Sequence, residues 1–95
     1  MELKDTVELM NSSDYKDRFK AEYYQLKTRY EKLKALLNKW DAYIMRFNQG
    51  DDLTLEQFLG FQPSCSYEIL REQQSHMGYY LHCLEVRAVI EHIDL

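Results

Sequence analysis

Lysines and tyrosines recur along one edge of the N-terminal half of the chain in a pattern that suits anion and base binding. Lys20 and Lys27 lie seven residues apart, with Tyr24 between them. Residues seven apart share one face of a helix. Lysines can hold phosphates, and a tyrosine ring offers a base a stacking surface worth about 1–3 kcal/mol. Tyr15 and Arg18 extend the patch. Alternatively, the lysines only solvate a helix and Tyr24 packs at an interface.

A second group of polar residues interrupts the apolar stripes of the C-terminal half. Gln74 and Arg87 fall where apolar residues recur, and Arg71 lies close by. Burying an arginine costs several kcal/mol unless it is paired. Arg87 is therefore predicted either to bind an anion through its guanidinium or to pair with an acid such as Glu22 or Glu31, or with an acid of a neighbouring subunit.

The sequence contains no familiar catalytic or metal-binding motif. It lacks a G-x-S-x-G sequence, a phosphate-binding glycine loop and a dinucleotide fingerprint. It also lacks C-x-x-C and H-x-x-x-H, and the adjacent His82 and Cys83 would diverge by about 100° on a helix. We therefore expect a protein that is not an enzyme, with no catalytic residues, no metal site and no cofactor.

A long heptad seam must position the first group. Apolar and aromatic residues recur at alternating spacings of four and three, with no Gly or Pro between them: Phe19, Tyr23, Leu26, Tyr30, Leu33, Leu37, Trp40, Ile44 and Phe47. This period predicts one amphipathic helix over residues 14–47, roughly 45–50 Å long.

The remaining elements are short except for one. Residues 1–12 are predicted to hold a short N-terminal helix, and residues 48–63 a connector with a short helix opened by the capping pair Thr54 and Gln57. A second long helix is predicted over residues 64–92. The fold class is thus all-α, an antiparallel helical hairpin forming a single domain over residues 1–95.

Apolar and charge patterns indicate what the hairpin would contact. The second long helix has two apolar stripes, and since one suffices to pack on the first helix, we expect the hairpin to self-associate. Residues 15–40 carry a net charge of +5, whereas residues 51–95 carry −6. The overall charge of −4 argues against DNA as a partner. No apolar run is long enough for a membrane span and no signal peptide is visible, which predicts a cytoplasmic protein.

The residues Tyr15–Leu33, Ile69–Gln74, Met77, Tyr80, Leu84 and Arg87 resemble small phage and prophage proteins. More distantly, they resemble the helical hairpin of phage anti-CBASS and anti-Thoeris sponge proteins. The resemblance covers residues 15–47 and 64–90. It implies an oligomer, often a hexamer, that sequesters cyclic oligonucleotide or cyclic ADP-ribose signals of bacterial immunity without cleaving them.

Two functional hypotheses follow. In the first, the protein is a sponge in the cytoplasm of an infected bacterial cell, and it binds a cyclic di- or trinucleotide or a cyclic ADP-ribose type ligand. A hexamer is the foremost assembly, with a dimer or tetramer open. The candidate ligand-binding residues are Tyr15, Arg18, Lys20, Tyr24, Lys27, Arg71, Gln74 and Arg87. In the second, the hairpin is an oligomeric protein–protein interaction module that blocks or scaffolds a host or phage protein through its acidic second arm and Phe58 and Phe61.

Overall fold

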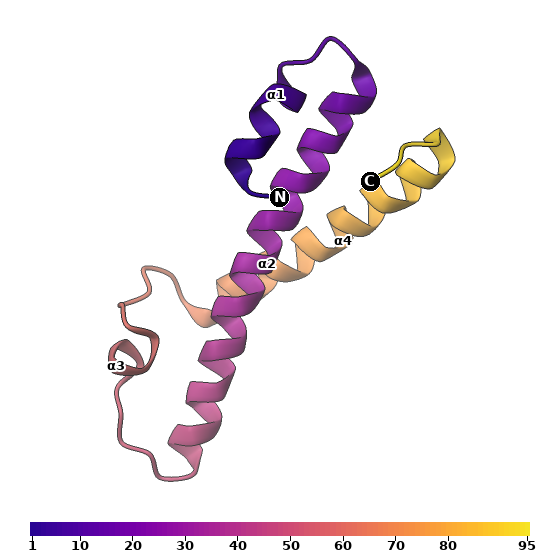
Figure 1. The fold of residues 1–95 in the computed structure, drawn as a ribbon. Coiled ribbons are helices and arrows are strands. Elements are labelled where there is room, and N and C mark those ends of the chain that lie inside the picture. The colour runs from indigo at the N-terminus through magenta and orange to yellow at the C-terminus, as the bar shows by residue number, and fades with distance from the viewer.

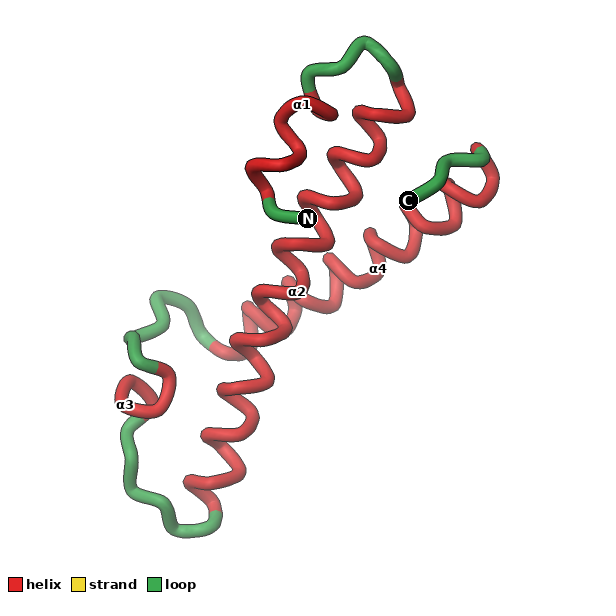
Figure 2. Tube along the Cα trace, in the orientation of Figure 1, coloured by secondary structure: helices red, strands yellow, loops and turns green.

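The chain folds into helices joined by short loops and turns (Figures 1 and 2). A computed structural model describes residues 1–95. The elements are a 3-10 helix, η1 (Leu3–Thr6), followed by α1 (Val7–Met10), α2 (Tyr15–Asn48), α3 (Leu55–Leu59) and α4 (Tyr67–Glu91). No β-strand is present, which confirms the predicted all-α class. None of the helices is both long and apolar enough to cross a lipid bilayer.

The long helix α2 is bounded by local signals and sets the length of the molecule. The Asp14 carboxylate accepts a hydrogen bond from the backbone N–H of Lys16 at 3.0 Å, which caps the first turn. After Asn48 the chain turns at Gly50, whose φ of +96° favours glycine. Thirty-four residues at a rise of ~1.5 Å each give about 51 Å, close to the largest extent of the molecule, 54 Å.

Helix α4 packs on α2 in the antiparallel direction. The contacts pair rising numbers in one helix with falling numbers in the other: Tyr67 with Trp40, Gly78 with Tyr30, and Arg87 with Tyr15. Figure 1 shows α4 leaving the middle of α2 obliquely and running back toward the N-terminal end of α2. The hairpin direction therefore agrees with the prediction, whereas self-association stays a prediction.

The caps of α4 lie inside the range predicted from sequence. Ser66 accepts a hydrogen bond from the N–H of Ile69 and caps the helix, so α4 begins at Tyr67 rather than at residue 64. His92 adopts a left-handed conformation with φ +56°, and the N–H of Ile93 then bonds the carbonyl of Ala88 at 2.9 Å. This turn brings Ile93 back to the core.

The core is thin and lies mainly between α2 and α4. It combines residues of the α2 seam and one α4 stripe with a residue after α4: Phe19, Tyr23, Leu81, Leu84, Ala88 and Ile93. Outside this cluster, four further residues are buried: Thr6, Ala21, Leu37 and Leu59. Only ten of 95 residues are buried, so most of the α2 and α4 surface stays exposed.

The last residues of the α2 seam extend beyond α4. Ile44 is 38% exposed and Phe47 57% exposed. The sequence pattern predicted that they would share the packed face, but α4 begins opposite Trp40 and cannot reach them.

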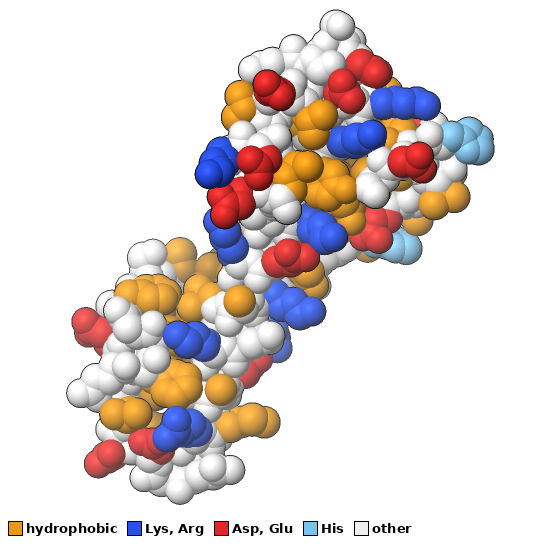
Figure 3. All heavy atoms as spheres, viewed as in Figure 1, with side chains coloured by type: hydrophobic (Ala, Val, Ile, Leu, Met, Phe, Trp, Pro, Cys, Tyr) orange, Lys and Arg blue, Asp and Glu red, His pale blue; other side chains and the backbone are white.

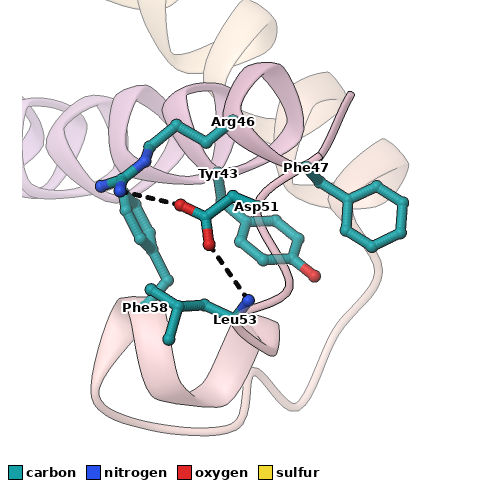
Figure 4. A pocket seen from close by; sticks show the side chains of 6 residues that line it. All are labelled: Tyr43, Arg46, Phe47, Asp51, Leu53 and Phe58. Carbon is teal, nitrogen blue, oxygen red and sulfur yellow. Dashed lines mark hydrogen bonds and ion pairs between the residues drawn. The ribbon is translucent and has the colours of Figure 1, made fainter. Parts of the chain in front are cut away.

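The connector is fastened to the end of α2 by an ion pair and an aromatic contact (Figure 4). Arg46 Nη2 lies 2.7 Å from Asp51 Oδ2, and its guanidinium lies 5.6 Å from the ring centroid of Phe58. The Tyr43 and Phe58 rings are 5.9 Å apart. These side chains leave no room between them for a water molecule, so this corner closes the connector rather than offering a ligand site.

The α2–α4 core should carry much of the stability. Leu84 is 1% exposed, so Leu84→Ala is expected to lower the free energy of unfolding by about 2–5 kcal/mol. Val89→Ala on the same helix, where the side chain is 77% exposed, is the control and should change it by less than about 0.5 kcal/mol. Urea denaturation at one fixed protein concentration measures both, and equal losses would contradict this assignment of the core.

Candidate ligand-binding groove

An open groove lies between α2 and α4 near the middle of the hairpin. It is lined by Tyr30 of α2 and by Arg71, Gln74, Ser75 and Gly78 of α4, and it has a volume of about 330 Å³. Small-molecule sites in proteins span roughly 300–1,000 Å³. The groove is therefore large enough for a small ligand, and four of its five lining residues offer a polar side chain.

The shape of the groove depends on a close approach between Gly78 and Tyr30. A Cβ atom on Gly78 would lie 3.4 Å from Cε2 of Tyr30, so the aromatic ring lies directly against the α4 backbone. A larger side chain at this position would need the space that the ring occupies. Because the ring is only partly buried, part of it remains available at the groove.

Arg71 supplies the cationic group of the groove and is held by several partners. Its Nη1 donates to Oε1 of Gln74 at 2.8 Å, and its Nη2 lies 3.2 Å from Oδ2 of Asp41. The guanidinium also lies 5.7 Å from the ring centroid of Tyr67. The side chain is nevertheless 46% exposed, so it is preorganised and still accessible to an anion.

A stripe of lysines, called the lysine stripe below, runs along the side of α2 that carries the partner of Arg71. Lys20, Lys27 and Lys34 recur every seven residues, and the next position of that series is Asp41, the partner of Arg71. Residues at this spacing share one side of a helix. Lys27 therefore lies on the same side of α2 as Asp41, with its Nζ 5.9 Å from the Tyr23 ring centroid.

Tyr24 is placed differently from the sequence-based expectation of a free stacking surface. Its ring packs edge-on against Tyr23, with centroids 5.1 Å apart, and it is partly buried against the core. The aromatic ring that does lie in the groove is Tyr30, which the heptad pattern assigned only to the seam.

Tyr15 and Arg87 form a separate cluster near the N-terminal end of α2. Arg87 Nη2 donates to the Tyr15 hydroxyl at 2.6 Å, its Nε bonds Oε2 of Glu91 at 3.1 Å, and its guanidinium lies 5.0 Å from the Phe19 ring centroid. Arg87 and Arg71 are sixteen residues apart, which places them on nearly opposite sides of α4. Within one chain Arg87 thus pairs with an acid, although not with Glu22 or Glu31 as the sequence suggested.

Arg18 lies at the start of α2, apart from both the groove and the Tyr15–Arg87 cluster. Its Nη1 donates to the backbone carbonyl of Ser12 at 3.0 Å, which ties the turn after α1 to the first turn of α2. The eight candidate residues therefore divide into the groove residues Arg71 and Gln74 with the adjacent lysine stripe, the partly buried Tyr24, the Tyr15–Arg87 cluster, and Arg18. Ser75 and Tyr30 also line the groove, although the sequence analysis did not select them. The one sequence signal for this position is Gly78, a residue without a side chain opposite an aromatic residue of the seam.

Tyrosine–carboxylate hydrogen bonds recur along the hairpin and shift the tyrosine ionisation. The hydrogen bond that Tyr67 donates to Asp41 raises the pKa of the Tyr67 phenol, and the bond that Tyr80 donates to Glu22 raises the pKa of the Tyr80 phenol. The nearby Glu91 carboxylate raises the pKa of both Tyr15 and Arg87.

No group of three or more His, Cys, Asp or Glu side chains converges to form a metal site.

The fold and the groove together define a class of small helical-hairpin protein with a polar, partly cationic groove between its long helices. The family model called Sequestin matches residues 13–90, and the chain belongs to the Sequestin family. This match confirms the resemblance drawn from the sequence and extends it across the connector. No curated protein and no solved structure matches the chain.

The tyrosine–carboxylate bonds predict how stability depends on pH. A phenol whose pKa is raised in the folded state stabilises the fold fully below the unfolded value of about 10, and this contribution is lost as the pH rises through the folded pKa. We expect Asp41→Asn to lower the pKa of Tyr67, because it removes the carboxylate that accepts the phenolic hydrogen.

Ultraviolet absorbance of the phenolate measures this change. In Asp41→Asn the tyrosine titration curve should reach completion at lower pH than in the unchanged protein. Asp51→Asn is the matched control, because that carboxylate pairs with Arg46 and accepts no tyrosine hydrogen bond. Identical titration curves for all three proteins would exclude the Tyr67–Asp41 bond in solution.

Proposed function

We propose that the protein binds and sequesters a cyclic di- or trinucleotide or a cyclic ADP-ribose type signal of bacterial immunity without cleaving it. The name of the Sequestin family itself denotes sequestration. The observation that carries the proposal is the groove in which Arg71 and Gln74 converge with Tyr30 beside the lysine stripe. A guanidinium suited to phosphate, an amide suited to a base edge and an aromatic ring suited to stacking are thus close together.

The groove residues have distinct roles in this proposal. Arg71 binds a phosphate of the ligand, and Lys27 and Lys20 add positive potential along the adjacent edge of α2. Tyr30 stacks on a base. Gln74 accepts from Arg71 through its Oε1, which leaves its amide N–H groups to donate to a base edge.

The size of the groove favours an assembly of several chains. About 330 Å³ is at the lower end of the range for ligand sites and suits one nucleotide unit rather than a whole cyclic dinucleotide. We propose that grooves or edges of two copies enclose one ligand, within a homo-oligomer that is foremost a hexamer. Tyr15, Arg18 and Arg87 can then contact the ligand only from a neighbouring copy.

The proposal places the protein in the cytoplasm of an infected bacterial cell and assigns it no catalytic residue. Binding without turnover has a direct test. Ligand incubated with a molar excess of protein and released by heat should be recovered intact by liquid chromatography. Recovery of a linear or hydrolysed product would show that the protein cleaves the ligand, and would refute sequestration without turnover.

Calorimetry and thermal melting with cyclic dinucleotides, cyclic trinucleotides and cyclic ADP-ribose isomers test binding itself. Arg71→Ala should weaken the binding that is found by on the order of ten-fold or more, because it removes a charge-assisted contact. Arg46→Ala is the matched control, since this arginine also pairs with a carboxylate and lies over an aromatic ring, but at the far end of α2. The absence of binding across the panel, or an equal loss in Arg46→Ala, would refute the proposed site.

A protein–protein interaction module is the second candidate function, and the far end of the hairpin favours it. Met45, Phe47 and Phe61 are 68%, 57% and 47% exposed there, whereas Phe58 is partly buried against Tyr43. A host protein bound at this end should be captured by Arg71→Ala and lost with a Phe47→Ser and Phe61→Ser double variant. If the double variant still captures the host protein, these phenylalanines do not form the binding surface.

A further inference from the structure

The outer face of α4 carries an apolar seam that no element of the chain covers. Tyr79, Cys83, Val86 and Ile90 are spaced four, three and four residues apart, on the side of α4 opposite the buried Leu84. Tyr79, Val86 and Ile90 are 71%, 44% and 69% exposed. These four residues are called the outer seam below.

The outer seam is continuous with further exposed side chains. Val89 beside it is 77% exposed, and the Tyr79 ring lies 6.5 Å from the ring of His82. In Figure 3, hydrophobic side chains lie at the surface beside histidines, all of which come from α4 and its C-cap. In Figure 1 no other helix of the chain lies along the side of α4 away from α2, and α2 is the only element that α4 contacts.

The chain as a whole exposes more surface than expected for a folded monomer of its mass. A folded monomer of 11.5 kDa is expected to expose roughly 5,800 Å², whereas this chain exposes 6766 Å². The excess is about 1,000 Å², and a standard protein interface covers about 800 Å² on each partner. A heptad pattern of apolar residues is the usual sequence requirement for a helix partner.

We infer that the outer seam is the interface with a second copy of the chain, packed antiparallel through α4. In antiparallel helix pairs, the two seam positions of the heptad face each other. Tyr79 then packs on Ile90 of the second copy, and Cys83 packs on Val86 of the second copy. All four residues of the outer seam are covered by this one arrangement.

Charge decides between the antiparallel and the parallel arrangement. Toward the start of α4 the seam spacing continues from Tyr79 through His76 to Glu72. In a parallel pair Glu72 would face the same glutamate of the second copy, and like charges at facing positions destabilise helix pairs. In the antiparallel pair Glu72 extends past Glu91, the last residue of the opposing helix. The interface does not involve the groove residues Arg71 and Gln74, so the inference stands whether or not a ligand binds there.

The two cysteines test the arrangement, because both are free thiols. In the antiparallel pair the Cys83 residues of two copies lie within roughly 10 Å of each other, whereas the Cys65 residues lie roughly 60 Å apart. A short bismaleimide should therefore link Cys65→Ser protein into covalent dimers through Cys83, and should not link Cys83→Ser protein through Cys65. Dimers through Cys65 would indicate a parallel pair and overturn the inference, as would the absence of any cross-link.

Particle mass by light scattering provides the second measurement. Val86→Glu places a charge in the outer seam and should lower the particle mass at least two-fold, with helicity by circular dichroism unchanged. Met45→Glu is the matched control, because it places the same charge on a 68% exposed apolar side chain of α2 and should leave the mass unchanged. An unchanged mass in Val86→Glu, or an unmodified protein that is already monomeric, would overturn the inference.

Discussion

Helix α2 is longer than any other single element of the chain can cover, and this constraint organises the structure. It has 34 residues, whereas α4 has 25 and crosses it obliquely. Each end of α2 therefore needs a partner of its own: η1 and α1 pack on one end, and α3 packs toward the other. The short elements η1, α1 and α3 each pack on α2, and none of them packs on α4.

The same packing creates the groove and exposes the outer face of α4. Because Gly78 lets Tyr30 lie against the backbone of α4, a residue of the packing seam also becomes part of a solvent-open site. Because α4 is a single layer with one side on α2, its opposite side has no partner within the chain. The polar groove and an exposed apolar surface thus arise on different sides of one helix, and a substitution on one side can leave the other intact.

Periodicity predicted the helices well, and it predicted their caps less precisely. The seam from Phe19 to Trp40 and the stripe of Leu81, Leu84 and Ala88 determine the hairpin, because apolar burial acts over whole helix faces. The groove was only partly predictable. Arg71 and Gln74 were recognised as polar residues near an apolar stripe, but their neighbour Tyr30 was not, since proximity across two helices depends on the crossing and on the absence of a side chain at Gly78. The partners of Arg87 were not predictable either. They depend on which side of α4 faces Tyr15, and the spacing of residues within α4 does not define that side.

The position of Asp41 has a consequence for selectivity. Its carboxylate already neutralises Arg71 in the free protein, so an incoming phosphate does not meet a vacant cation but must exchange with an internal anion. An anion with the charge and bidentate reach of a phosphate group can make that exchange, whereas a weak monoanion gains little by it. Under the proposed function, Asp41 is therefore a tethered competitor, and the groove discriminates by the strength of the anion before any base is recognised.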